Sequence, residues 1–243
     1  MIKFFRKIRY DLMEKNKTGM YFKYAIGEII LVVIGILIAL SINNWNESKK
    51  ESIIRNNYYE QILQDLTKDI IYINRQIEHL NSSISSYTNY TETLKNKESI
   101  DEIINEFMKL DWEFAYLNFN TNTIESLIST GDIKLMPDVI RNRLLDLKNT
   151  QNNLIKVTSG NDAVYLNSNR KALGLGGINY ILELHPNLTN SLYRTEDKID
   201  VLNLLNESFQ LKNYTELGLS ISLKSILESI DKLSELINEE IKK

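Results

Sequence analysis

Apolar residues are unevenly distributed along the chain, and one uninterrupted run dominates its first fifth. The run YAIGEIILVVIGILIALSINNW covers residues 24–45, and its centre, residues 29–42, carries no charge. About twenty helical residues, at ~1.5 Å each, cross a ~30 Å hydrocarbon core. Tyr24 and Trp45 flank the run at the depths where amphipathic aromatic side chains favour the membrane interface. A buried core helix rarely stays apolar on every face for four turns, so the pattern predicts a transmembrane helix over residues 24–45.

Charge on the two sides of this run predicts its orientation. The basic residues are concentrated before it, where only Asp11 and Glu14 oppose them: Lys3, Arg6, Lys7, Arg9, Lys15, Lys17 and Lys23. The positive-inside rule places residues 1–23 in the cytoplasm as a leader, and residues 46–243 outside. Residues 2–15 have helical apolar spacing, which fits either an amphipathic helix on the anionic leaflet or a basic tail that only sets topology.

The small residues near the end of the run raise the question of cleavage. Ala39-Leu40-Ser41 has the small-x-small pattern of a signal-peptide cleavage site. The basic region is long for a signal peptide, however, and the apolar run continues to Ile42. We therefore expect an uncleaved anchor.

Three residues of the predicted span are candidates for contacts inside the membrane. Glu28 lies one turn inside the apolar stretch, where it is either a functional carboxylate or a headgroup-level side chain near Lys23. Gly35 and Ala39 form a small-xxx-small pair that allows two helices to approach closely.

Helical periodicity continues beyond the span. Residues 54–94 repeat apolar side chains at steps of three and four, which predicts that the transmembrane helix continues into a stalk helix of about fifty residues. Residues 215–241 carry a second long stripe of the same kind, including Ile230. We expect the final helix to pack antiparallel on the stalk, because each stripe is too long to remain in water. The alternative is that the stripes pair between chains as a coiled coil.

The elements between these two helices are shorter and are predicted from caps and breakers. The predicted elements are a turn at 95–99, a helix capped by Ser99 to about Leu110, a helix or extended linker at 111–119, a helix capped by Thr123 and stopped by Gly131, a helix from Asp138 to Leu173 with a possible interruption at 159–160, and a helix at 200–211. LGLGG at 173–177 is expected to be a turn. The predicted fold class is all-α: a single transmembrane helix, a stalk and an antiparallel helical bundle.

Composition excludes several functions. A net charge of −3 is too balanced for a nucleic-acid binder, and the chain has no cysteine. Only two histidines are present, and no G-x-S-x-G, Walker or H-E-x-x-H motif occurs. Asp65 and Asp69 are interpreted as a solvated charged face, and His79 as a polar-face histidine. Asp111 and Glu113 have no histidine near them in sequence. We therefore expect no enzyme activity, no metal and no cofactor.

The membrane run, followed by Asn46 and Glu47, resembles an uncharacterised family of single-pass membrane proteins from Bacteroidota, a domain of unknown function. A second stretch of that family is similar to TNTIESLISTGDIKLMPDVIRNRLLDL, residues 121–147. The resemblance implies a Gram-negative inner membrane with the soluble part in the periplasm, and it brings no established activity.

The second stretch is also the best candidate for a functional patch. Its small hydroxyl side chains and two adjoining helix ends fit the capture of a partner loop or a small polar ligand, or a plain structural corner. The candidate residues are Thr123, Glu125, Ser126, Ser129, Gly131 and Asp132.

Two functions remain for the whole chain. The first is an interaction or scaffold protein that contacts the bilayer and either another membrane protein or a second copy of itself. The second is a ligand-sensing bundle for a small molecule. Because a leader of about 23 residues is too short for a signalling domain, a sensor of this kind needs a separate output partner.

Overall fold

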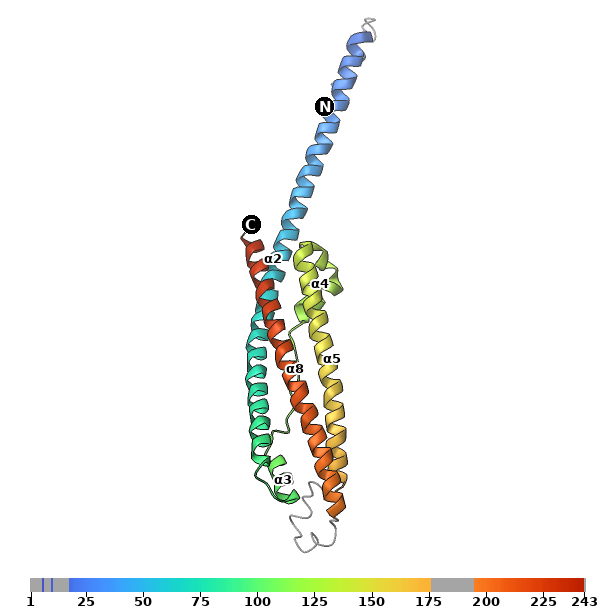
Figure 1. The fold of residues 1–243 in the computed structure, drawn as a ribbon. Helices are drawn as coiled ribbons and strands as arrows, with labels where there is room; N and C mark the ends of the chain where they lie inside the picture. Colours follow the sequence, from blue (N-terminus) through green and yellow to red (C-terminus); the bar gives the residue numbers. More distant parts are fainter. Residues whose placement is uncertain (1–5, 7–9, 11–17, 176–194, 243) are drawn as a thin grey trace. The chain divides into compact units, whose positions relative to one another are not determined.

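The computed structural model describes Arg6, Tyr10, residues 18–175 and residues 195–242 (Figure 1). These residues form helices and no strand, which confirms the predicted all-α fold class. In chain order, the elements are α2 (Thr18–Leu94), α3 (Ile100–Phe107), α4 (Asn122–Thr130), the 3-10 helix η1 (Asp132–Leu135), α5 (Asp138–Gly174) and α8 (Thr195–Ile241).

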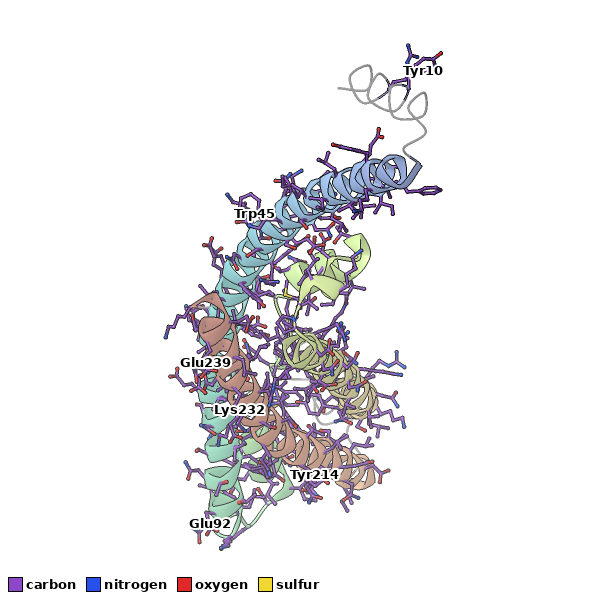
Figure 2. All side chains as sticks on the ribbon, turned by 90° about the horizontal axis from the view of Figure 1, so that it is seen from above. Tyr10, Trp45, Glu92, Tyr214, Lys232 and Glu239 are labelled. Carbon is purple, nitrogen blue, oxygen red and sulfur yellow. The ribbon has the colours of Figure 1, made fainter. Side chains whose placement is uncertain are left out.

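The chain divides into two compact units, Met1–Asn57 and Tyr58–Lys243, and α2 contributes to both. In the first unit, every side chain from residue 29 to residue 51 is exposed. This is the one helix in the described residues that is long and apolar enough to cross a membrane, and its most apolar window has no buried residue. Trp45 projects from it (Figure 2). The structure thus contains one candidate membrane span, near the N-terminus.

The second unit is built around three long helical segments: residues 58–94 of α2, α5 and α8. Figure 1 shows α8 running opposite to the other two. α8 packs most extensively against α5, and it shares one hydrophobic core with α2. The antiparallel pairing of the final helix with the stalk is therefore confirmed, with α5 as an additional and closer neighbour. The most completely buried members of this core are Tyr59, Ile62, Ile73, Leu80, Leu127, Leu144, Leu223, Ile226, Ile230 and Leu233.

A second hydrophobic cluster is rich in aromatic rings. Phe107 of α3 lies between Tyr90 of α2 and Phe209 of α8, with ring centroids 4.7 and 5.5 Å away. Trp112 meets Phe209 edge-on at 4.8 Å. Tilted and edge-on ring pairs of this kind add to the free energy of simple area burial. The short helix α3 is thereby fixed against the long helices.

The short elements follow the sequence prediction, with two refinements. Ser99 caps α3, and its side chain accepts a hydrogen bond from the Glu102 N–H. Residues 111–121 are extended rather than helical. Thr121, not Thr123, is the N-cap residue of α4. Gly131 ends α4 with φ +79°, a left-handed conformation that only glycine adopts without strain.

The prediction of two helices at the C-terminal end is wrong: α8 is one helix from Thr195 to Ile241. The apolar stripe stops between Phe209 and Leu219, which suggested a break. Lys212 and Glu216 occupy the buried face there instead, so the helix continues with charged side chains in its stripe. Figure 2 shows Tyr214, Lys232 and Glu239 on the exposed side of the same helix.

α5 also continues without interruption, and Ser159 and Gly160 both lie inside it. A glycine within a helix costs about 1 kcal/mol relative to alanine. This cost is too small to interrupt a helix of 37 residues. Leu173 and Gly174 are the last two residues of α5, and Leu175 is a turn residue, so the predicted LGLGG turn begins one residue after the helix ends. Gly176, Gly177 and most of the predicted leader helix lie outside the described residues.

Candidate functional site

The predicted patch around α4 is a corner whose side chains are used locally. Thr123 is buried, and its hydroxyl donates to Asp65 Oδ2 at 2.6 Å. Glu125 is exposed and pairs with Lys148 Nζ at 3.2 Å. The hydrogen bond from Lys148, and a second from the Thr121 hydroxyl, hold the pKa of the Glu125 carboxyl below its usual value. Both residues therefore join α4 to neighbouring helices.

The remaining patch residues also have partners inside the corner. The hydroxyls of Ser129 and Thr130 donate to the Ser126 carbonyl at 3.0 and 2.9 Å. Asp132 Oδ2 accepts from Tyr58 at 3.0 Å and from Thr130 at 3.0 Å. These hydrogen bonds and the left-handed conformation of Gly131 give the residues of this corner a structural role. Binding at this corner stays a prediction.

The interpretation of Asp65 and Asp69 as a solvated charged face is wrong. Asp69 is 1% exposed, and its two carboxylate oxygens accept three hydrogen bonds. Oδ1 accepts from the backbone and side-chain N–H groups of Asn120 at 2.8 and 2.7 Å, and Oδ2 accepts from Gln151 Nε2 at 2.9 Å. A buried carboxylate is tolerated only with such partners. Asp69 fastens the extended segment to α2 and to α5.

A buried polar cluster joins α2 to α8 further along the bundle. Lys212 Nζ lies 2.6 Å from Glu216 Oε1 and 2.9 Å from Ser83 Oγ. The Ser83 hydroxyl in turn donates to Glu216 Oε2 at 2.8 Å. All three residues are at most 7% exposed. From the sequence, Lys212 and Glu216 look like an ordinary exposed i, i+4 pair. The one sequence signal for a buried polar group is that Ser83 lies on the apolar stripe of the stalk.

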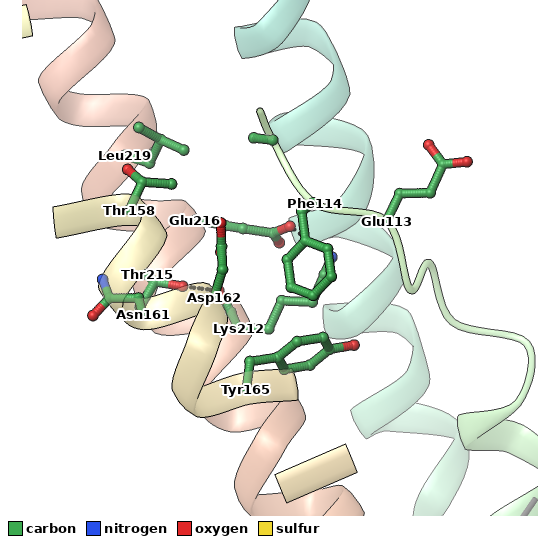
Figure 3. Close-up of a pocket in the computed structure, with 11 residues that line it drawn as sticks. Glu113, Phe114, Thr158, Asn161, Asp162, Tyr165, Lys212, Thr215, Glu216 and Leu219 are labelled. Carbon is green, nitrogen blue, oxygen red and sulfur yellow. Dashed lines mark hydrogen bonds and ion pairs between the residues drawn. The ribbon is translucent and has the colours of Figure 1, made fainter. Parts of the chain in front are cut away.

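A polar pocket opens beside this cluster, between α5, α8 and the extended segment (Figure 3). Its cavity volume is about 30 Å³. Burial raises the pKa of the Asp162 carboxyl, and the nearby Glu216 raises it further while Lys212 lowers it. The residues that line the pocket are Glu113, Phe114, Ala115, Thr158, Asn161, Asp162, Tyr165, Lys212, Thr215, Glu216 and Leu219.

A more apolar groove adjoins the pocket and shares four of its residues. Its volume is about 260 Å³, and it runs between residues 114–117 and α5. Tyr116 forms part of its rim and is 79% exposed. The Tyr72 hydroxyl donates to the Tyr116 carbonyl and accepts from the Asn118 N–H at 3.1 Å, which fixes the backbone of this rim on α2. The groove has no signal in the sequence, because the extended segment and α5 meet only in the folded chain.

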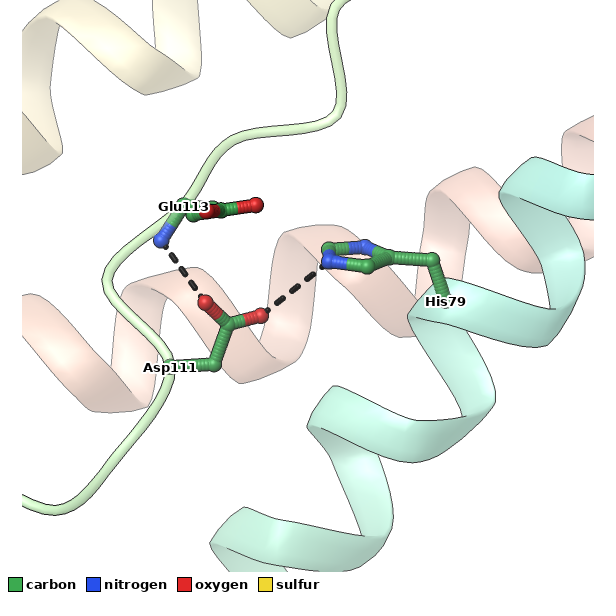
Figure 4. Close-up of side chains that lie close together, drawn as sticks. All are labelled: His79, Asp111 and Glu113. Carbon is green, nitrogen blue, oxygen red and sulfur yellow. Dashed lines mark hydrogen bonds and ion pairs between the residues drawn. The ribbon is translucent and has the colours of Figure 1, made fainter.

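A third cluster brings together residues that sequence reasoning kept apart. His79 Nε2 of α2 lies 3.3 Å from Asp111 Oδ2, and Asp111 Oδ1 accepts from the Glu113 N–H at 2.9 Å (Figure 4). One ligand atom from each of the three residues lies within 4.8 Å of the others, so the set could hold a metal ion. The His79–Asp111 ion pair and the hydrogen bond from the Glu113 N–H already explain the arrangement. The ion pair holds the extended segment against the stalk. The expectation of no metal site stays a prediction.

The three membrane residues lie on the helix of the first unit. A Cβ added to Gly35 would meet nothing within 4 Å, and Ala39 is exposed. Glu28 is half-buried. The described chain has no second copy beside this helix, so contacts between spans at these positions stay a prediction.

Comparison with known proteins identifies a family for this chain. The fold defines the class: a helix that is long and apolar enough to cross a membrane, followed in the described residues by an all-helical unit. The chain belongs to DUF6090, a family of unknown function, whose model matches residues 28–170. The match covers residues 28–47 of the first stretch on which the resemblance was based, and all of the second, residues 121–147. No curated protein and no solved structure shows significant similarity to the chain.

Proposed function

We propose that this protein is a single-pass anchor of a Gram-negative inner membrane, with its N-terminus in the cytoplasm and its helical unit in the periplasm. The single apolar helix and the basic excess before it support this topology. The resemblance to Bacteroidota membrane proteins supports the type of envelope.

The helical unit is, in this proposal, an interaction module for a second membrane-anchored protein. The groove between residues 114–117 and α5 carries the proposal. Its walls are mostly apolar, and Tyr116 exposes a large aromatic ring at the rim. Amphipathic aromatic residues of this kind are enriched where proteins contact one another. The occupant is a chain segment of the partner that carries apolar side chains.

Photo-crosslinking in intact cells tests this function. Tyr116 is replaced by p-benzoylphenylalanine, and the crosslinked species are identified by mass. We expect one discrete crosslinked protein other than a second copy of this chain. Ala163→Trp fills the groove and should abolish the crosslink, whereas Asn167→Trp on the exposed face of α5 should preserve it. A crosslink of dimer mass, or one that Ala163→Trp leaves unchanged, contradicts the proposal.

Topology is tested separately with a periplasm-dependent reporter fused to Lys243. An active reporter is expected, together with a mature chain that still contains residues 1–45. An inactive fusion contradicts the orientation, and a mature N-terminus near Ile42 contradicts the uncleaved anchor.

The second candidate function, sensing of a small ligand, is favoured by the polar pocket. A helical bundle with an enclosed polar site fits a sensor that signals through a separate partner.

A further inference from the structure

One edge of the extended segment's backbone is bonded to α2. The Tyr72 hydroxyl donates to the Tyr116 carbonyl and accepts from the Asn118 N–H. Asp69 Oδ1 accepts from the Asn120 N–H at 2.8 Å. In an extended chain, the N–H and C=O of every second residue point to the same side, and those of the residues between them point to the opposite side. The backbone groups of residues 116, 118 and 120 therefore face α2.

The opposite edge of the segment is unpaired. By the same alternation, the N–H and C=O of Leu117 and the C=O of Ala115 point away from α2. None of these three groups forms a hydrogen bond with any residue that the structure describes. We call them the unpaired edge. Backbone groups of this kind form strong hydrogen bonds, and a row of them along an extended chain is a template for pairing with a further chain.

The unpaired edge lies on the side of the groove. Residues 114–117 form one wall of this groove, which has a volume of about 260 Å³, and α5 forms the other. Figure 1 shows the segment as a thin green trace between α2 and α5. Because α2 takes up the bonded edge, the edge that remains is turned toward the groove. An occupant of the groove therefore meets hydrogen-bonding groups as well as apolar side chains.

The spacing of these groups selects the conformation of the occupant. A helix uses its backbone N–H and C=O groups internally and has none to offer to Leu117. An extended chain presents an N–H and a C=O from every second residue along one edge. The wall of α5 runs from Ile155 to Leu166, about 16 Å at ~1.5 Å per residue, which equals about five residues of strand. Ile155, Ala163 and Leu166 make this wall apolar, so alternate side chains of the occupant are apolar as well.

We propose that the groove binds an extended segment of about five residues of the protein partner, which adds as a strand to the unpaired edge. This inference rests on the proposed function of the groove and states how the partner is recognised. Main-chain hydrogen bonds to Leu117 and Ala115 supply affinity, and every second side chain packs against α5 and supplies specificity. The partner segment alternates apolar and polar residues.

The test uses the full chain in detergent micelles and the peptide Thr-Val-Thr-Val-Thr-amide, labelled with fluorescein at its N-terminus and followed by fluorescence anisotropy. We expect saturable binding that the unlabelled acetyl peptide reverses. Two further competitors carry N-methyl groups, one on both valines and the other on all three threonines. Each lacks the N–H groups of one edge of the peptide. We expect one of them to compete as well as the parent peptide and the other to fail.

A change of one backbone atom connects the binding to the unpaired edge. Cell-free synthesis replaces Leu117 by the corresponding α-hydroxy acid, which puts an ester oxygen in place of the N–H and keeps the side chain. The loss of one hydrogen bond should weaken peptide binding roughly 2–10-fold. The same replacement at Phe114 removes an N–H that has no partner in the described part of the chain and does not belong to the unpaired edge. It should leave binding unchanged, and the two ester chains should melt at the same temperature.

The proposal is overturned if the peptide does not bind saturably at about 5 mM, if the two N-methylated peptides behave alike, or if the two esters have equal effects. Failure of the proposed function gives a different result. If the peptide passes these tests but position 116 crosslinks to no partner in cells, the groove function fails and the strand-binding edge stands. If position 116 crosslinks to a partner and the peptide fails, the function stands and strand addition is wrong.

Discussion

The buried Lys212–Glu216 pair gives the most decisive test of the bundle. Lys212→Met removes the cation and leaves the Glu216 carboxylate, in a residue that is 7% exposed, with the Ser83 hydroxyl as its hydrogen-bond donor. An uncompensated buried charge costs about 3–5 kcal/mol. The double variant Lys212→Met/Glu216→Leu removes both charges and fills the space with apolar atoms, which is commonly neutral or stabilising. We therefore expect the second substitution to rescue the first.

The size of the effect follows from the size of the folding unit. Tyr58–Lys243 contains 186 residues, for which 1 kcal/mol shifts the melting temperature by roughly 2–4 °C. Lys212→Met should lower the melting temperature by roughly 6–20 °C, and the double variant should recover most of that loss. Near-UV circular dichroism of the full chain in detergent micelles, followed during heating, measures both.

A matched control separates burial from loss of charge. Lys224→Met also removes a lysine from α8, but at an exposed position, and should change stability by no more than about 0.5 kcal/mol. The reasoning is refuted if Lys212→Met costs no more than Lys224→Met. It is equally refuted if the double variant is as unstable as the sum of its two single substitutions, because the two side chains would then not interact.

Three further predictions test the core, the extended segment and the pocket. Ile230→Asp places a charge at a fully buried position and should cost several kcal/mol in thermal melting, whereas Ser229→Asp, on the exposed side, should not. Asp69→Ala leaves the buried Gln151 amide without its acceptor and should cost roughly 1–3 kcal/mol in urea unfolding, with earlier proteolysis within residues 111–121. Asp162 has a raised pKa, so the folded state binds its proton more readily than the unfolded state, and its ionisation costs stability as the pH rises above 3.8, the ordinary value. Asp162→Asn should therefore raise the melting temperature at pH 7, with a gain that vanishes at low pH; a constant gain across pH would contradict this.

The helices could be predicted from sequence wherever apolar spacing and caps agree. The Ser99 cap, the Gly131 stop and the start of α5 after Pro137 each have a local physical cause that involves neighbouring residues. The long apolar stripes of α2 and α8 likewise have too much apolar surface to remain exposed to water. These signals depend on residues three or four apart, which the sequence shows directly.

The errors share one physical cause, polar side chains on buried faces. Asp69, Ser83, Lys212 and Glu216 interrupt apolar stripes and look like solvated positions or breaks in a helix. Each is buried because it forms a hydrogen bond with a residue of a different element. Asp69 bonds to Asn120, which is 51 positions away, and Ser83 bonds to Glu216, which is 133 positions away. Periodicity within one helix carries no information about such a partner. The pocket, the groove and the His79 cluster depend on contacts across elements in the same way.

The final helix has a consequence for the order of folding during synthesis. Residues of α8 belong to both hydrophobic clusters, and the 47 residues of this helix leave the ribosome after α2 and α5. At 5–20 residues per second, translation of α8 alone takes about 2–9 s. During that time the apolar faces of α2 and α5 lack the helix that covers them. The two hydrophobic clusters can therefore be completed only after α8 has been made, and a chain that stops before α8 exposes to proteases the surfaces that α8 buries.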